Sequence, residues 1–251
     1  MKNIKMTKTS KKDTLNLIGI SGKINSGKDT VGKILQYLSS EEYSNGNYSY
    51  ASFLVDKDSP YQIKKFADKL KDIVCLLIGC TREQLEDGEF KDKPLGKEWD
   101  DSHGINTPRE LLQVLGTDCG RDIIHPNIWV NALFADFEDN KSGWLSGINS
   151  NWVVTDVRFP NEAQAIKDRG GIVIRVNRPF EIRVQHSGRE DDFTIEMFDP
   201  NNEKHVTFKK GYDLNNHPSE TALDDYEFDH VIDNNGSIEE LIEKVKQLKL
   251  V

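Results

Sequence analysis

Short apolar segments alternate with amphipathic ones along most of the chain. Five segments have the length and apolar content of strands: Leu15–Ser21, Tyr61–Phe66, Trp152–Asp156, Gly171–Val176 and His230–Asp233. Elsewhere apolar residues recur at intervals of three and four positions, as at Val31, Ile34 and Leu35, which predicts helices. Strands that alternate with helices predict an α/β fold, in which a doubly wound parallel sheet carries helices on both faces.

Capping signals place the starts of several of these helices. Thr107, Pro108 and Glu110 combine a capping box with a proline in the first helical turn, and Ser237 with Glu240 repeats the capping-box spacing. Three more residues are expected to cap or open helices: Asp68, Pro126 and Asn161.

A long polar stretch separates the last two predicted strands. Within it, Phe193–Phe198 and His205–Lys209 alternate apolar and polar residues around a turn at 199–202, which predicts a β-hairpin. We expect this hairpin to belong to a lid over residues 177–216, inserted into a single domain of residues 15–251. The Lys-rich residues 1–14 are expected to form a flexible tail, and Glu41–Pro60 a surface loop.

The composition excludes several classes of protein. Of the 251 residues 36% are apolar, yet no apolar run approaches the roughly 18 residues that a membrane-spanning helix needs. The formal net charge of −9 argues against a nucleic-acid polymer as partner, but leaves room for a local cationic pocket that binds a small anion. The tail lacks the apolar stretch of a secretion signal, and the three cysteines form no CxxC pair. We therefore expect a cytoplasmic protein with reduced cysteines.

A glycine-containing loop joins the first predicted strand to the first predicted helix. Residues 22–30 read GKINSGKDT, a P-loop pattern in the strand–loop–helix context that this motif requires. Its backbone N–H groups and the helix N-terminus would face phosphate oxygens, and Lys28 would bridge the β- and γ-phosphates of a nucleotide. The alternative is a glycine-rich turn that only caps a helix. The predicted phosphate-binding residues are Gly22, Asn25, Ser26, Gly27, Lys28, Asp29 and Thr30.

Two acidic positions could bind Mg²⁺. Asp29 stands where P-loops usually carry a metal-ligating Ser or Thr, and Thr30 follows it, so the metal could be held by both or through water. Asp156 ends a predicted strand and resembles the Walker-B position, which orients Mg²⁺ or its waters. Arg158 comes two residues later, so both should reach the crevice at the strand ends. The alternative is an Asp–Arg pair that stabilises a loop. Lys28, Asp156 and Arg158 are the candidate catalytic residues.

Other cations could hold a second phosphate. Arg109 and Arg121 flank one predicted helix, and Lys71 lies in the first turn of another, where a cation opposes the helix dipole unless an anion joins it. Arg178 stands at the start of the predicted lid, from which arginines can neutralise a transferring phosphoryl group. Each is alternatively a solvated surface charge. Asn235, before the last helix, is a candidate adenine contact or an ordinary turn residue.

Six segments follow one another in order over most of the chain: Ser21–Leu35 (SGKINSGKDTVGKIL), Lys65–Lys71 (KFADKLK), Thr107–Arg121 (TPRELLQVLGTDCGR), Thr155–Ile166 (TDVRFPNEAQAI), His217–Glu220 (HPSE) and Asp233–Ile242 (DNNGSIEELI). Together they resemble the deoxynucleoside monophosphate kinases of tailed bacteriophages, within the nucleoside monophosphate kinase branch of P-loop proteins. The combination is far more specific than the P-loop alone. The long loop at 41–60 and the lid hairpin depart from the family pattern.

The resemblance implies a three-layer P-loop kinase fold with a helical acceptor-binding part over residues 61–140 and a lid. It implies transfer of the γ-phosphate of ATP, with Mg²⁺, to a small-molecule deoxynucleoside 5′-monophosphate (dNMP) in a host cytoplasm. A homodimer is compatible with it. The alternatives are a small-molecule kinase of the same branch, of the phosphomevalonate or dephospho-coenzyme A kinase type, and a non-catalytic nucleotide-binding regulator. By matching position, the resemblance suggests acceptor-binding residues: Lys71, Arg109, Gln113, Arg121, Arg158 and Glu162.

Overall fold

The structure, a computed structural model, describes most of the chain: residues 16–40, 59–99, 104–137, 151–179, 181–186, 193–198, 205–208 and 218–251. Between 181 and 208 only the backbone of three strands is described. The predicted tail and most of the predicted loop at 41–60 lie outside these residues, as does the turn of the predicted hairpin.

A five-stranded parallel sheet forms the centre of the molecule, with strand order β2-β3-β1-β4-β8. Its strands are β1 (Leu17–Ser21), β2 (Tyr61–Lys64), β3 (Asn151–Val157), β4 (Ile172–Asn177) and β8 (His230–Asp233). Each corresponds to a predicted strand, and the doubly wound α/β fold is confirmed. All five residues of β1 are buried, because helices cover both faces of the sheet.

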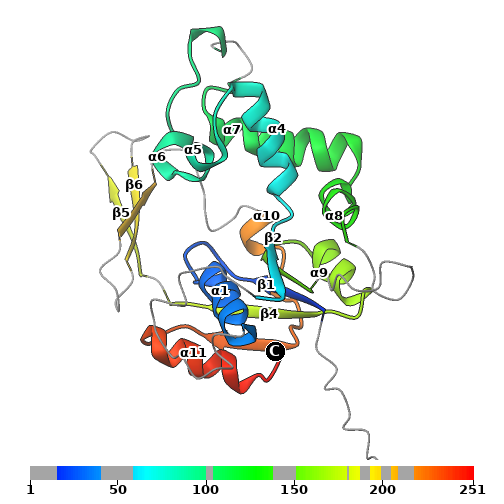
Figure 1. Cartoon of the computed structure of the whole chain (residues 1–251). Coiled ribbons are helices and arrows are strands. Elements are labelled where there is room, and N and C mark those ends of the chain that lie inside the picture. The colour runs from blue at the N-terminus through cyan, green and yellow to red at the C-terminus, as the bar shows by residue number, and fades with distance from the viewer. Residues whose placement is uncertain are drawn as a thin grey trace, which may run out of the picture.

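Alternate residues of the strands contribute to two hydrophobic cores, one on each face of the sheet. On one face, Ile18, Val153 and Ile174 pack with helices α1 (Lys28–Ser39) and α11 (Ile238–Gln247). On the other face, strand residues pack with α9 (Pro160–Lys167) and with helices beyond the sheet. The sheet is therefore the middle of three layers, with α1 and α11 on one side and α9 on the other (Figure 1).

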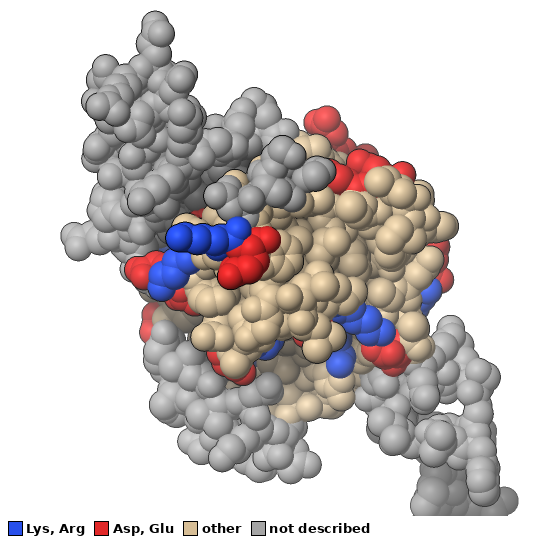
Figure 2. All heavy atoms as spheres, turned by 90° about the horizontal axis from the view of Figure 1, so that it is seen from above, with Lys and Arg blue, Asp and Glu red and all other residues tan. Residues whose placement is uncertain are grey.

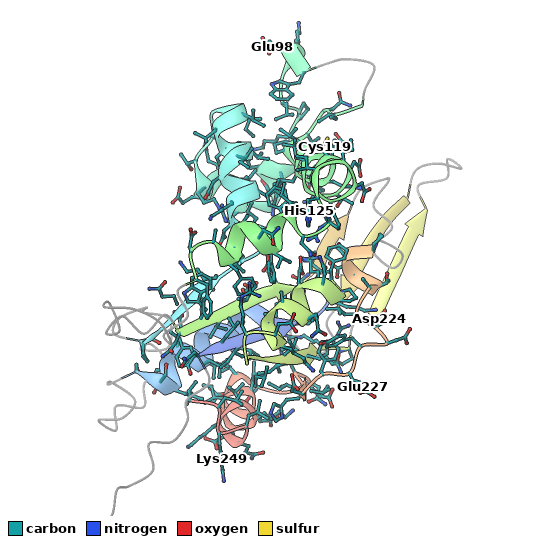
Figure 3. The ribbon with its side chains drawn as sticks, turned by 90° about the vertical axis from the view of Figure 1, so that its right-hand side faces the viewer. Glu98, Cys119, His125, Asp224, Glu227 and Lys249 are labelled. Atoms are coloured by element: carbon teal, nitrogen blue, oxygen red, sulfur yellow. The ribbon has the colours of Figure 1, made fainter. Side chains whose placement is uncertain are left out.

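A group of helices stands beyond the β2 side of the sheet (Figure 1). It contains α4 (Asp68–Ile78), α5 (Arg82–Glu86), α6 (Gly88–Lys91), a 3₁₀ turn (Lys97–Trp99), α7 (Pro108–Gln113) and α8 (Ile128–Phe134). Figure 3 shows this helical part, which carries Glu98, Cys119 and His125, at the opposite end of the molecule from Lys249. The sequence did not predict α5, α6 or the 3₁₀ turn, since each is a single turn or little more.

Helix α7 continues as a π-helix over Val114–Ile124, which the sequence did not predict. The backbone N–H of His125 donates to the carbonyl of Gly120, five residues earlier, at 3.0 Å. π-helical turns are rare and occur mostly near functional sites. The indole N–H of Trp129 on α8 donates to the carbonyl of Gly116 at 2.7 Å and fixes the π-helix against its neighbour.

Most helix starts agree with the capping signals, but two predicted caps are wrong. Thr107 and Glu110 form the predicted capping box of α7. Asp68 is the first residue of α4 rather than its cap, and its side chain accepts the Lys65 N–H at 2.9 Å. Asn161 lies inside the first turn of α9, because its amide donates to Asn127 instead. The N-cap positions are Ala67 and Phe159.

The other helix starts differ only in detail. Helix α8 begins two residues after Pro126, at Ile128. Ser237 caps α11 by accepting the Glu240 N–H at 3.3 Å.

A second, antiparallel sheet lies apart from the central one (Figure 1). It contains β5 (Glu181–His186), β6 (Phe193–Phe198) and β7 (His205–Phe208) in that order. Strands β6 and β7 pair antiparallel over the two segments predicted as hairpin strands, while β5 was not predicted. The role of this second sheet as a lid stays a prediction.

Within the described residues, no helix combines the length and hydropathy needed to cross a membrane.

Candidate active site

Residues 22–27, which the sequence predicts to bind phosphate and which we call the phosphate loop, connect β1 to α1 as expected. Gly27 precedes α1 with φ +93°, a left-handed conformation that favours glycine, and a Cβ there would lie 2.4 Å from the amide nitrogen of Asn234. That amide donates to the carbonyl of Ser26 at 2.9 Å and is buried. Asn234, in the segment before α11, therefore supports the loop.

The interior of the loop is tight and polar. A Cβ on Gly22 would lie 2.3 Å from Oγ of Ser26. This Oγ is one of two buried side-chain polar atoms without a hydrogen-bond partner among the described residues. A buried hydroxyl without a hydrogen-bond partner is energetically costly. An oxygen of a ligand bound at this loop would provide the partner that the protein lacks.

Lys28 is the first residue of α1, and its side chain is almost fully buried. Burial and the nearby Arg158 lower the pKa of Lys28, while the carboxylates of Asp29, Glu220 and Asp156 oppose this shift. A cation held in a partly desolvated loop interacts strongly with an arriving phosphate.

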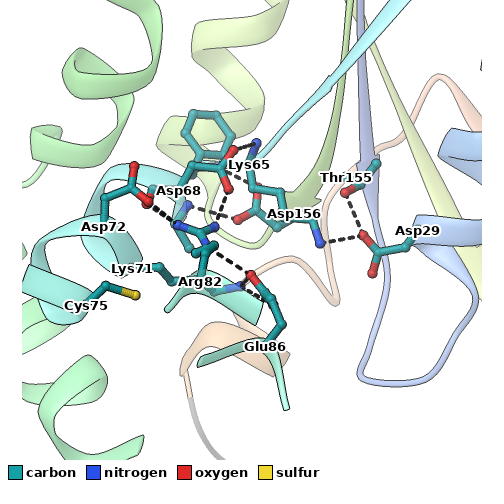
Figure 4. A network of polar contacts seen from close by, with 12 residues as sticks. Asp29, Lys65, Asp68, Lys71, Asp72, Cys75, Arg82, Glu86, Thr155 and Asp156 are labelled. Atoms are coloured by element: carbon teal, nitrogen blue, oxygen red, sulfur yellow. Dashed lines mark hydrogen bonds and ion pairs between the residues drawn. The ribbon is translucent and has the colours of Figure 1, made fainter. Parts of the chain in front are cut away.

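Asp29 is tied to two neighbouring elements (Figure 4). Its Oδ1 lies 2.9 Å from Nζ of Lys65 and accepts the hydroxyl of Thr155 at 2.8 Å. Burial alone would raise the pKa of Asp29, but Lys65 holds it below its usual value. Asp29 therefore stays ionised and joins the start of α1 to the end of β2.

Asp156, at the end of β3, fastens the chain between β2 and α4. Its two carboxylate oxygens accept the backbone N–H groups of Phe66 at 2.7 Å and Ala67 at 3.0 Å. Burial raises the pKa of Asp156, and these N–H groups oppose the shift. The same side chain lines a cavity between the strand ends and the helical part.

The oxygen ligands near the loop fit a cation that arrives with a nucleotide. Mg²⁺ prefers oxygen ligands and commonly takes one or two carboxylates together with substrate phosphates. Asp29 and Asp156 both lie close enough to Lys28 and Lys65 to shift the pKa of each lysine. The described residues contain no cluster of three or more acidic, His or Cys side chains that could hold a metal alone. Thr30, in the first turn of α1, is the third predicted ligand.

A cavity of about 250 Å³ opens between the strand ends and the helical part. Six of the seven predicted substrate-binding residues line it: Lys71, Arg109, Gln113, Arg121, Arg158 and Glu162. Its apolar lining includes Phe66, Leu70, Leu112, Trp129 and Phe159. The structure thus brings together residues from α4, α7, the π-helix, β3 and α9.

The cations of this cavity lie beside acidic residues. Lys71 pairs with Glu86 at 2.7 Å, and Arg109 binds Asp92 through two contacts of 2.6 and 3.1 Å. Lys91 also lines the cavity, and burial together with Arg109 and Lys71 lowers its pKa. On the face seen in Figure 2, Lys and Arg side chains likewise lie next to Asp and Glu rather than in one basic patch.

Glu162 is 1% exposed and organises the deep wall of the cavity. Its Oε1 accepts Arg121 at 2.5 Å, and its Oε2 accepts the backbone N–H groups of Arg158 at 2.7 Å and Phe159 at 3.1 Å. Burial raises the pKa of Glu162 to about 7, although Arg121 opposes the shift. The Arg121 guanidinium also stacks 4.1 Å from the ring centroid of Phe159.

This raised pKa makes the stability of the protein depend on pH. The folded state holds the Glu162 proton more tightly than the unfolded state, so the stabilisation is complete below about pH 4.5 and is lost as the pH rises through about 7. Relative to Glu162→Gln, the wild type should lose about 3 kcal/mol of unfolding free energy over this range. Denaturant unfolding at a series of pH values measures this difference. Glu243→Gln, on the exposed face of α11, is the control, and parallel pH curves for wild type and Glu162→Gln would contradict the assignment.

A second hollow, of about 470 Å³, lies beside the phosphate loop, whose Lys23 and Ser26 line it. Ser26, Arg178 and Asn235 line it, together with the ends of β4 and β8. The structure therefore does not bring Arg178 together with the other six predicted substrate residues. Arg178 follows β4 directly and lines this hollow instead, and the predicted contact of Asn235 with adenine stays a prediction.

Four residues of the site were not assigned by the sequence: Lys65, Lys91, Glu220 and Asn234. Three of them fall in segments that the sequence singled out, namely KFADKLK, HPSE and DNNG. Their partners are distant in sequence, so no spacing rule could have assigned their contacts. No sequence signal marked Lys91.

Comparisons with known proteins find one family of kinases. A sequence model described as deoxynucleotide monophosphate kinase matches residues 96–199. A protein of Acanthamoeba polyphaga mimivirus, provisionally named deoxynucleotide monophosphate kinase, is 34% identical over 142 residues, which are 53% of this chain and 69% of that protein. The deoxynucleoside-5′-monophosphate kinase of Escherichia phage T5 is 28% identical over 32% of each chain.

A third relative is the deoxynucleotide monophosphate kinase of Escherichia phage RB69. It is 29% identical over 56% of this chain, which corresponds to 43% of the phage protein. The chain thus spans most of the mimivirus protein but less than half of the two phage proteins. These matches are accompanied by the parallel sheet that the family resemblance implies. The chain belongs to the deoxynucleotide monophosphate kinase family.

Proposed function

We propose that the chain transfers the γ-phosphate of ATP to a deoxynucleoside 5′-monophosphate, giving the diphosphate and ADP. The observation that carries this proposal is the position of Arg158. It lines the cavity of the acceptor side, and its charge lowers the pKa of Lys28 in the phosphate loop. A donor phosphate at the loop and an acceptor phosphate in the cavity would meet beside these two cations.

In this proposal the two nucleotides occupy two sides of the site. The phosphate loop binds the donor phosphates, and the hollow beside Ser26 and Asn235 takes the donor nucleoside. The cavity under the helical part takes the acceptor, whose base meets its apolar lining and whose phosphate meets its cations. Residues 61–140 form the acceptor part in this proposal, and residues 177–216 the lid. The names of the relatives support a deoxynucleotide acceptor.

The chemistry that these residues must supply is electrostatic. The attacking group is an ionised phosphate oxygen, so no general base is needed. Lys28 offsets charge on the donor phosphates, and Arg158 offsets charge that develops between donor and acceptor. Mg²⁺ bound near Asp29, Thr30 and Asp156 would supply further neutralisation of the phosphates. The walls of the cavity fix the acceptor for in-line attack and exclude water. The relatives' viral origin supports action in a host cytoplasm.

An acceptor panel tests the proposal. The protein, ATP and Mg²⁺ are mixed separately with each dNMP, each ribonucleoside monophosphate, phosphomevalonate and dephospho-coenzyme A, and ADP is measured. We expect ADP formation with at least one dNMP and weaker formation with ribonucleotides. Strong transfer to a non-nucleotide acceptor alone would contradict the proposal. Equal rates with ribonucleoside and deoxyribonucleoside monophosphates would contradict only the expected preference for the deoxy acceptor.

A further inference from the structure

Glu220 lies between the phosphate loop and Arg158. It belongs to the short helix α10 (Pro218–Thr221), and 7% of it is exposed. Its Oε2 accepts the backbone N–H of Ile24, inside the phosphate loop, at 2.9 Å. Its Oε1 forms an ion pair with Nη1 of Arg158, which also lies 3.4 Å from the hydroxyl of Ser219. One buried carboxylate therefore joins the donor loop to an arginine of the acceptor cavity.

The charges explain why a carboxylate is needed at this place. Lys28 and Arg158 are close enough for Arg158 to lower the pKa of Lys28, so the two cations repel each other. Glu220 is among the carboxylates that oppose this shift. Without a counter-charge, Arg158 would turn away from Lys28 towards solvent, since about a third of its side chain is exposed.

Stability alone does not account for this ion pair. Buried ion pairs are often no more stabilising than apolar residues of similar size, because desolvation offsets the attraction. Their geometry is nevertheless specific. Glu162 holds the backbone N–H of Arg158 at 2.7 Å, while Glu220 holds its guanidinium, so Arg158 is fixed at both ends. A guanidinium has five N–H donors and can bind a carboxylate and a phosphate oxygen at the same time.

We propose that Glu220 is a positioning residue for phosphoryl transfer, which holds the Arg158 guanidinium against the phosphate loop before the substrates bind. The inference rests on the proposed function. It predicts that Glu220 acts through Arg158, so that its removal matters only while Arg158 is present. It also predicts that the effects of removing Glu220 and of removing Arg158 on kcat are strongly non-additive.

A double-mutant cycle tests this coupling. Glu220→Ala, Arg158→Ala and the double variant are compared with the wild type for kcat, for the acceptor KM and for ATP affinity by calorimetry. We expect Glu220→Ala to lower kcat about 100-fold, as loss of an aligned charge donor does, and to cost less than threefold in the Arg158→Ala background. Glu220→Gln keeps an acceptor for the Ile24 N–H but loses the charge, so its kcat should fall between those of wild type and Glu220→Ala.

Controls separate this role from a structural one. Asp225→Asn removes an exposed carboxylate from the same segment and should leave kcat unchanged. Thermal unfolding shows whether each variant folds. A Glu220→Ala variant with normal kcat, or one whose loss simply adds to that of Arg158→Ala, would overturn the inference. If the wild type transfers phosphate to no dNMP, the proposed function fails. In that case the double-mutant cycle is judged by ATP affinity alone. Additive effects of Glu220→Ala and Arg158→Ala on that affinity would overturn the inference.

Discussion

Replacing Lys28 with alanine should reduce phosphoryl transfer by roughly 10³-fold or more while leaving the fold intact. Lys28 is 9% exposed, stands at the start of α1 and lies close to Arg158 and three carboxylates. Alanine would remove the ammonium that offsets charge on the donor phosphates. Steady-state kcat with ATP and a dNMP, together with thermal unfolding, measures both parts of this prediction.

A lysine of the same helix provides the matched control. Lys33 is exposed on α1, and Lys33→Ala should retain wild-type turnover. If Lys28→Ala also turned over at the wild-type rate with an unchanged unfolding temperature, the loop would be a structural turn rather than a phosphate site.

Arg158→Ala should lower kcat by about 10²–10³-fold, chiefly through the acceptor side. Arg158 lines the acceptor cavity at the end of β3 and is held by Glu162 and Glu220. Its removal would take away the cation between the two phosphates and leave the buried Glu220 without its ion-pair partner. We therefore expect some loss of stability as well, of a few kcal/mol.

Arg158→Lys separates the loss of kcat from the loss of stability. Lysine keeps the positive charge near Glu220 but loses the planar, multidentate guanidinium, so stability should largely return while kcat stays reduced. Arg169→Ala, which removes an arginine that stacks on Phe134 outside the cavity, should leave kcat unchanged. Normal acceptor KM and kcat in Arg158→Ala would show that Arg158 is only structural.

The parallel sheet could be predicted because its strands are buried on both faces. Residues such as Ile18, Val153 and Ile174 give continuous apolar runs that differ from helical spacing. The strand–loop–helix position of residues 22–30 could be predicted because the glycines and Lys28 have a fixed spacing between a strand and a helix. In both cases the determining interactions are local or periodic in sequence.

The parts that could not be predicted depend on contacts between distant segments. Asn234 supports Ser26 from 208 positions away, and Glu220 reaches Ile24 from 196. Asn161 has a short polar side chain near the start of a helix, yet it lies inside the first turn of α9 and its amide binds Asn127 instead of capping the helix. The turn that follows β4 carried Arg178 away from the acceptor cavity, a direction that no residue pattern specified.

Tracing the γ-phosphate of ATP tests the central claim most directly. ATP labelled with ³²P at the γ position is incubated with Mg²⁺, each dNMP and the protein, and the products are separated by chromatography. Transfer predicts that the label appears in the deoxynucleoside diphosphate, in a one-to-one ratio with ADP, and that Lys28→Ala abolishes this product. Label that is released only as inorganic phosphate, or that stays in ATP with every dNMP, would contradict the account.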